Sequence, residues 1–238
     1  MRTHGLVSER GQSLVELALL LVLIALVALG ILRLLGVSVA DVFCQVVTGI
    51  GLQTGLCPGG SGPLFSDDFS GDLSNWEFLR GNNWSQENEQ LCVGRGGEHR
   101  ALALDSDATD YTVAVDALLT RGNGYGVYFR ASTDDLGRLQ GYIFQYDPGY
   151  GSGQFLYRQW VNGYERSPFA RGAPPAGFEW LGTERHIEVV VQGNTFTARV
   201  DGETVLVAQD DAWTSGQAGL RTWDGTDVCF DNFTVTAP

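Results

Sequence analysis

The sequence contains no lysine, one methionine and three histidines. All fifteen basic residues are arginines, against 28 aspartates and glutamates, which gives a net charge of −13 at pH 7. The missing lysine is consistent with a coding bias toward arginine. Because an acidic protein is repelled by phosphate backbones, we expect no nucleic-acid partner.

Motifs of catalytic and metal sites are also missing. The sequence has no C-x-x-C pair and no G-x-S-x-G elbow, and its histidines are isolated. Carboxylates of the kind that bind Ca²⁺ occur in Asp-rich turns, near Asp67 and Asp68 and from Asp105 to Asp110, but solvated turns are the favoured explanation for them. We therefore expect no metal and no cofactor.

The four cysteines are even in number, and an exported protein would pair them as disulfides. We favour Cys44–Cys57, which closes a short local loop, and Cys92–Cys229, which joins two predicted strands. Reduced, buried cysteines are the alternative.

Long apolar runs are confined to the N-terminal part. Residues Leu17 to Leu32 carry no charge, and with their flanks they approach the roughly 20 residues that span a bilayer. Arg2 and Arg10 precede this run and favour a cytoplasmic N-terminus, with the rest of the chain outside. The segment is thus predicted to be a membrane helix.

Glu16 at the head of this run is unusual for a simple anchor. A carboxylate costs about 2.5 kcal/mol or more if it enters the bilayer, so it usually has a partner. Cleavage after Gly11 would create an amino group at Gln12, and that group on a neighbouring chain would suit Glu16.

The stretch ERGQSLVELALLLVLIALVALGILRLLGVSVADVFCQVV resembles the Flp-type (type IVb) pilins, and with the helix continuing to about Ile50 the resemblance covers about 45 residues. Gly11, Glu16 and the apolar helix match the pattern, while Leu17 replaces a frequent tyrosine. The resemblance implies cleavage by a prepilin peptidase and packing against other pilin-like subunits. It also implies an inner-membrane precursor and a mature form in a surface pilus. A signal peptide cut after Ala40 and a plain signal anchor are the alternatives.

Four regions follow: a leader (1–11), a pilin-like helix and tail (12–57), a Pro/Gly linker (58–63) and a β domain (64–238). Short runs rich in β-branched and aromatic residues recur in the last region at a spacing of about ten residues, which predicts an antiparallel two-sheet sandwich. The predicted strands are Trp76–Arg80, Glu89–Val93, Arg100–Asp105, Asp110–Thr120, Tyr125–Ala131, Leu139–Asp147, Phe155–Val161, Arg185–Gln192, Thr195–Asp201, Glu203–Val207, Ala218–Trp223 and Asp227–Val235. Tight hairpins are expected at Gln192-Gly193-Asn194 and Asp201-Gly202.

The order of motifs in this region resembles the concanavalin A-like lectin/glucanase superfamily, including its laminin-G-like modules. The matching pieces are DDFSGDLSNW, NGYGVYFRA, GYIFQYDPG, RQWVNG, NTFTARVDG, GLRTWDG and FDNFTV. The resemblance implies a jelly roll of two curved sheets that often binds sugars. Glucanases of the superfamily carry E-x-D-x-x-E on one strand, and this sequence lacks it. We therefore expect a protein that is not an enzyme.

Three strands place an arginine and an aromatic residue two positions apart, and so on one face. A mid-strand arginine is expected to face solvent. Aromatic faces stack on sugars, and arginines bind hydroxyls or carboxylates. The predicted ligand-binding residues are Tyr128, Arg130, Arg158, Trp160, Arg221 and Trp223, with one of Tyr142 and Gln145, which lie on opposite faces of one strand.

This site requires arginines without internal carboxylate partners. If the arginines merely cover a sheet face, the sandwich is a structural coat of the filament. The favoured function is surface adhesion through glycan binding. A membrane-anchored glycoside hydrolase-like protein is the third alternative.

Overall fold

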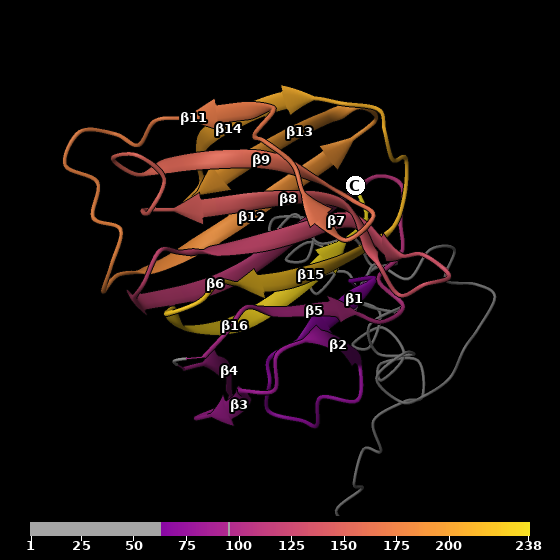
Figure 1. Cartoon of the computed structure of the whole chain (residues 1–238), viewed down its shortest axis with the longest axis horizontal. Helices are drawn as coiled ribbons and strands as arrows, with labels where there is room; N and C mark the ends of the chain where they lie inside the picture. The colour runs from indigo at the N-terminus through magenta and orange to yellow at the C-terminus, as the bar shows by residue number, and fades with distance from the viewer. Residues whose placement is uncertain (1–62, 95) are drawn as a thin grey trace, which may run out of the picture. The chain divides into compact units, whose positions relative to one another are not determined.

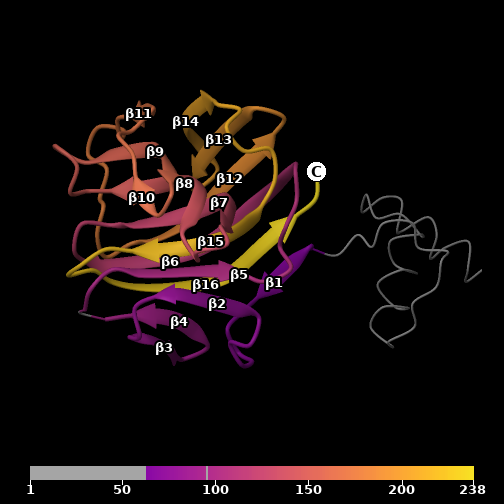
Figure 2. The same cartoon turned by 45° about the vertical axis from the view of Figure 1, so that its right-hand side comes forward.

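The structure, a computed structural model, describes residues 63–94 and 96–238, and all of its regular elements in these ranges are β-strands. The described part contains no helix long and apolar enough to cross a membrane. Sixteen strands form two antiparallel sheets that stack against each other (Figures 1 and 2). The predicted all-β sandwich is thus confirmed, while the predicted N-terminal helix lies outside the described residues.

Sheet A contains eight strands. In spatial order they are β14 (Glu203–Gln209), β13 (Thr195–Val200), β12 (Glu184–Gln192), β6 (Tyr111–Arg121), β16 (Asp227–Thr236), β4 (Gln90–Val93) and β3 (Trp84–Glu87). The eighth strand, β1 (Phe65–Asp67), pairs with the C-terminal half of β16, so the first and last strands of the domain are neighbours (Figure 2).

Sheet B also contains eight strands. In spatial order they are β10 (Tyr164–Glu165), β9 (Gln154–Val161), β8 (Leu139–Asp147), β7 (Tyr125–Thr133), β15 (Gln217–Thr222), β5 (His99–Ala103) and β2 (Trp76–Arg80). The eighth strand, β11 (Ala170–Gly172), pairs with β9.

The main core lies between the sheets and follows from alternation along the strands. In β6, Tyr111, Val113 and Val115 are buried, while the residues between them are only partly buried. β12 repeats this pattern with Ile187 and Val189. A period of two places one apolar face inward and one polar face toward water, as expected for the sheets of a sandwich.

Two tight hairpins confirm the predicted turns. β12 and β13 are joined through Gly193, whose φ is +56°, and Asn194. β13 and β14 are joined by Asp201 and Gly202, with φ values of +53° and +81°. Positive φ at both central residues, as in Asp201-Gly202, is typical of the type I′ hairpin, whereas a glycine with positive φ at the first central position alone, as in Gly193-Asn194, is typical of type II′.

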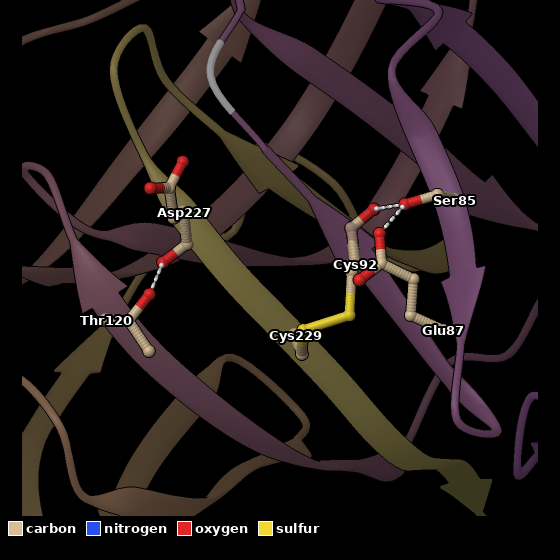
Figure 3. The surroundings of a disulfide bond; sticks show 6 residues. All are labelled: Ser85, Glu87, Cys92, Thr120, Asp227 and Cys229. Atoms are coloured by element: carbon tan, nitrogen blue, oxygen red, sulfur yellow. Dashed lines mark hydrogen bonds between the residues drawn. A yellow bond between two sulfur atoms is a disulfide. The ribbon is translucent and has the colours of Figure 1, made fainter.

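The predicted disulfide between Cys92 and Cys229 is present (Figure 3). The two residues face each other across β4 and β16, with their Cα atoms 4.0 Å apart, although 137 positions separate them in sequence. The bond fixes the outer strands β3 and β4 to the centre of sheet A. Cys44 and Cys57 lie outside the described residues.

Candidate functional site

The outer face of sheet B departs from simple alternation. Nearly all residues of β7 and β8 are buried, so both faces of these strands are covered. On the outer face a second apolar cluster is formed by Leu102, Tyr128, Ala131, Leu139, Ile143 and Trp160. Because this cluster lies on the side of sheet B that faces away from sheet A, other side chains must shield it from water.

Arginines and glutamates make up this cover. The strand register places Arg221 of β15 beside Arg100 of β5 on one side and Gly126 of β7 on the other, with Gln145 of β8 beyond Gly126. A Cβ atom at Gly126 would lie 2.4 Å from the Ile143 side chain. The glycine therefore leaves the face clear between the side chains of Arg221 and Gln145.

Glu98 and Glu165 connect these groups. Arg221 donates through Nε to Glu98 Oε1 (2.7 Å) and through Nη1 to Glu165 Oε1. Arg100 binds Glu98 with two parallel hydrogen bonds of 3.0 and 2.6 Å. Since Glu165 belongs to β10 yet bonds to β15, the β9–β10 hairpin folds over the outer face of sheet B. We call Glu98, Arg100, Arg158, Glu165 and Arg221 the Arg–Glu cluster.

Trp160 lies beneath this cluster and is only 2% exposed. The guanidinium carbons of Arg100 and Arg221 lie 4.1 and 4.8 Å from the centre of its ring. The prediction that Trp160 offers an open surface for stacking is therefore wrong, because two arginines already cover it. Trp223 is only partly buried and lies 5.0 Å from the Arg221 guanidinium, so it is the aromatic ring of this set that remains accessible.

The predicted absence of carboxylate partners is also wrong. Burial alone would raise the pKa of Glu98, but the hydrogen bond from Arg100 and the charge of Arg221 outweigh it and lower the pKa. Glu98 is therefore held ionised as a hydrogen-bond acceptor. The Arg221 guanidinium, 9% exposed, is kept charged between its two carboxylates.

The Tyr128 hydroxyl lies below the same charges. Burial raises the pKa of Tyr128 far above its usual value, and Arg221 and Arg100 offset this only in part. The hydroxyl is buried and makes no hydrogen bond to any described residue, and the same holds for the indole nitrogen of Trp160.

A loop from Asp147 to Gly153 borders the cluster. Burial raises the pKa of Asp147 to about 6, while backbone N–H groups of Tyr150 and Gly149 and the charge of Arg158 oppose the shift. The Tyr150 ring lies 5.4 Å from the Arg158 guanidinium and 5.2 Å from that of Arg171. Arg158 also donates to Gln145 Oε1 (2.8 Å).

Six of the predicted residues are brought to this face: Tyr128, Gln145, Arg158, Trp160, Arg221 and Trp223. Arg130 is not, although sequence parity placed it with Tyr128. A bulge follows Phe129, and Arg130 has a φ of +44°, which turns its side chain to the end of the sandwich. There it is 2% exposed and donates to the backbone oxygens of Thr109, Trp213 and Gly193.

Tyr142 also lies off this face, because it is on the opposite side of β8 from Gln145. Its ring packs in the main core against Phe129 and Phe196, and its hydroxyl donates to Asp210 (2.5 Å). Of the two alternatives on this strand, Gln145 therefore joins the candidate site.

Sequence reasoning did not identify Glu98, Arg100, Glu165 or Tyr150. A signal for two of them exists, since Glu98, immediately before β5, has the same parity as Arg100 and Leu102 of that strand. Glu165 has no such signal. It lies in the two-residue strand β10, which is too short to show an alternating pattern, and it reaches the site because the β9–β10 hairpin folds over sheet B.

The Asp-rich turn near the domain start forms part of an open cleft of about 540 Å³ that includes Asp67, Asp68, Asp72 and Asn232. Asp68 and Asp72 each accept hydrogen bonds from a serine two residues on, and Asp67 from Phe69 and Trp76. Among residues 63–94 and 96–238, no group of three or more His, Cys, Asp and Glu side chains is arranged to hold a metal.

The predicted processing and assembly residues Gly11, Gln12 and Glu16 lie outside the described residues.

A family model described as the 3-keto-alpha-glucoside-1,2-lyase-like domain matches residues 60–236. A levanase of Bacillus subtilis (strain 168) is 26% identical over 166 residues, which are 70% of this chain and 23% of the levanase. The chain therefore corresponds to less than a quarter of that enzyme.

Solved structures share the fold. The carbohydrate-binding module CBM66 from Bacillus subtilis matches with a TM-score of 0.58 and 23% identity, covering 70% of this chain and 98% of the module. A β-glucanase of Bacillus licheniformis matches with a TM-score of 0.54 and 13% identity over 75% and 99% of the two chains. The lumenal domain of VIP36, in a form bound to Ca²⁺ and Man2, matches with a TM-score of 0.56 and 10% identity. The match covers 73% of this chain and 87% of that domain.

Proposed function

The chain belongs to the 3-keto-alpha-glucoside-1,2-lyase-like domain family, and from this membership we propose that residues 64–238 form a carbohydrate-binding module. The proposed site is the Arg–Glu cluster with Gln145 and Trp223. It differs from the site expected from the sequence, because the condition of arginines without carboxylate partners is not met and Glu98 and Glu165 take part as hydrogen-bond acceptors. The similarity to the levanase segment and to a carbohydrate-binding module supports this function.

The observation that carries the proposal is the alternation of donors and acceptors across one face. A sugar hydroxyl both donates and accepts hydrogen bonds, so adjacent hydroxyls are suited to adjacent carboxylates and guanidinium groups. Glu98 and Glu165 supply acceptors and hold the donors of Arg100 and Arg221 in place. Arg158 adds a donor that is held by Gln145 and the backbone oxygen of Arg166. Trp223 adds a partly exposed ring that suits the apolar face of a sugar.

The same geometry favours binding over catalysis. A general acid needs a raised pKa, whereas the pKa of Glu98 is lowered by its arginines. One observation favours the hydrolase alternative, because burial raises the pKa of Asp147 to about 6. Burial is the main cause of that shift, however, and the backbone N–H groups of Tyr150 and Gly149 and the charge of Arg158 oppose it.

We further propose that a pilin-like N-terminal segment displays this module at the cell surface for adhesion. The support is the sequence pattern at Gly11, Gln12 and Glu16. A prepilin peptidase and other pilin-like subunits are the partners, and the precursor resides in the inner membrane. Repetition along a filament would convert a weak sugar site into strong attachment.

The test is a glycan array probed with the full chain, followed by affinity measurements for Arg158→Gln and Trp223→Ala. We expect binding by the wild type without hydrolysis of the bound sugar. Each variant should bind about tenfold more weakly, which corresponds to about 1.4 kcal/mol. Both side chains are partly exposed, so the melting temperature should change little.

The matched control is Arg199→Gln, which removes one positive charge from sheet A and should bind like the wild type. If the wild-type chain binds no carbohydrate, the binding proposal is wrong and the structural-coat alternative is favoured. Variants that bind normally would show that the module uses another surface.

A further inference from the structure

Arginines in this acidic domain are almost all paired with carboxylates. Of the eleven arginines that the structure describes, nine lie within 4.0 Å of an Asp or Glu oxygen in the described residues. Arg166 and Arg171 are the two exceptions in this part of the chain, and both are exposed. With a net charge of −13, carboxylates are abundant, so two unpaired arginines in one short segment are a local departure.

This segment borders the proposed sugar site. Arg166 follows β10 directly, and Arg171 lies in β11, whose register places it beside Leu156 of β9. The backbone oxygen of Arg166 accepts a hydrogen bond from Arg158 Nη1 (3.0 Å). The segment is therefore fixed to a member of the Arg–Glu cluster.

An aromatic ring connects the second arginine to the cluster. The guanidinium groups of Arg158 and Arg171 lie 5.4 and 5.2 Å from the centre of the Tyr150 ring. Cation–π contacts of this kind hold a guanidinium in place without neutralising its charge. Arg171 is thus positioned while no carboxylate of residues 63–94 and 96–238 pairs with its hydrogen-bond donors.

Carboxylates near these arginines are already engaged. Glu165 accepts from Arg221 and Gln145, and its distance to Arg158 Nε is 3.9 Å. Asp147 is held by its own loop. Neither carboxylate forms an ion pair with Arg166 or Arg171, so the charges of these two arginines are not neutralised by a direct partner in the described residues.

We propose that the site takes an acidic carbohydrate, whose carboxylate or sulfate group binds Arg171 and Arg166 while its hydroxyls bind the Arg–Glu cluster. The inference rests on the proposed carbohydrate-binding function and adds the class of ligand. Guanidinium groups bind planar carboxylates and sulfate-type oxygens with paired, charge-assisted hydrogen bonds. The negative charge elsewhere on the domain would restrict such a ligand to this edge.

Two matched pairs of polysaccharides test the proposal with the full chain: polygalacturonate against its fully methyl-esterified form, and dextran sulfate against dextran. We expect at least one acidic polymer to bind at least tenfold more tightly than its neutral counterpart. The preferred pair distinguishes a carboxylate from a sulfate ligand. Because exposed charges are screened by salt, the preference should shrink in 0.5 M NaCl.

Arg166→Gln and Arg171→Gln should each reduce this preference about fivefold or more, and Arg199→Gln should leave it unchanged. Equal or tighter binding of the neutral polymers would overturn the acidic ligand while leaving carbohydrate binding intact. A preference that is reduced equally by Arg199→Gln would also overturn it, since net charge alone would then be responsible. Failure to bind any carbohydrate would overturn both proposals.

Discussion

At the scale of single residues, Tyr128 and Tyr142 lie on neighbouring strands, but only the hydroxyl of Tyr142 is hydrogen-bonded to described residues. The Tyr128 hydroxyl is buried without a hydrogen bond to any described residue. The Tyr142 hydroxyl donates to Asp210 (2.5 Å) and accepts from the Trp213 backbone N–H (3.2 Å). Identical substitutions at the two positions therefore separate the effect of a hydrogen bond from that of packing.

Tyr142→Phe should lower the free energy of unfolding by about 1–2 kcal/mol, because it leaves the Trp213 N–H without its acceptor and removes one of the hydrogen bonds to Asp210, which keeps those from Gln159 and Ala212. Tyr128→Phe should be neutral or slightly stabilising, because it removes a hydroxyl that is buried unpaired. Urea denaturation of both variants beside the wild type measures the difference. A larger loss for Tyr128→Phe would show that its hydroxyl has a partner in solution.

Residue-level predictions of the site depended on strand parity, that is, on the alternation of side chains between the two faces of a strand. They failed where a strand is irregular. Arg158 and Arg221 lie on the shared face that parity predicted, although Arg221 is buried beneath Glu98 and Glu165 instead of facing water. Arg130 was misplaced because it lies inside a bulge of β7, between Phe129 and Ser132, where parity no longer holds. The idea that mid-strand arginines face water also failed at this position, where backbone oxygens satisfy the buried guanidinium.

At the scale of elements, all twelve predicted strands are present with ends within a residue or two. Their apolar alternation and the glycine-containing turns carry enough local information. The four strands that were not predicted are β1, β3, β10 and β11, which have two to four residues each. β3 reads Trp-Ser-Gln-Glu, and such short polar strands depend on their neighbours rather than on their own sequence.

The disulfide between β4 and β16 is the element-level feature with the largest expected effect on stability. Its loop spans 137 positions, and in the chain-entropy model a loop of this size contributes about 4–5 kcal/mol. Replacing Cys92 and Cys229 by serine together should lower the free energy of unfolding by up to this amount in urea denaturation.

Reduction provides the control for the disulfide variant. The wild type under dithiothreitol should approach the stability of the double variant, whereas the double variant itself should not respond. A double variant as stable as the oxidised wild type would mean that strand pairing alone fixes β3 and β4.

At the scale of the whole molecule, the spacing of Gly11 and Glu16 predicts a mature chain that begins at Gln12. Mass spectrometry of the protein isolated from its cells measures this directly. A start at Asp41 would instead support a signal peptide, and an intact Met1 a plain anchor.

Under the pilin model, Glu16→Ala should leave the chain in the membrane but impair filament assembly, and normal filaments from this variant would contradict the proposed role of the carboxylate.

The position of the disulfide also has a mechanical consequence. A pull on the chain at Pro63 first opens β1, which holds β16 through three residues. Unravelling can then release at most about 30 residues, roughly 100 Å of chain, before the load reaches Cys92 and a covalent bond. Every residue of the candidate site, from Glu98 to Trp223, lies inside the loop that this bond closes. The disulfide and the chain from Cys92 to Cys229 form a closed ring. A force between Pro63 and a bound ligand is consequently divided between the two paths around this ring, one through the backbone after Cys92 and one through the disulfide to Cys229.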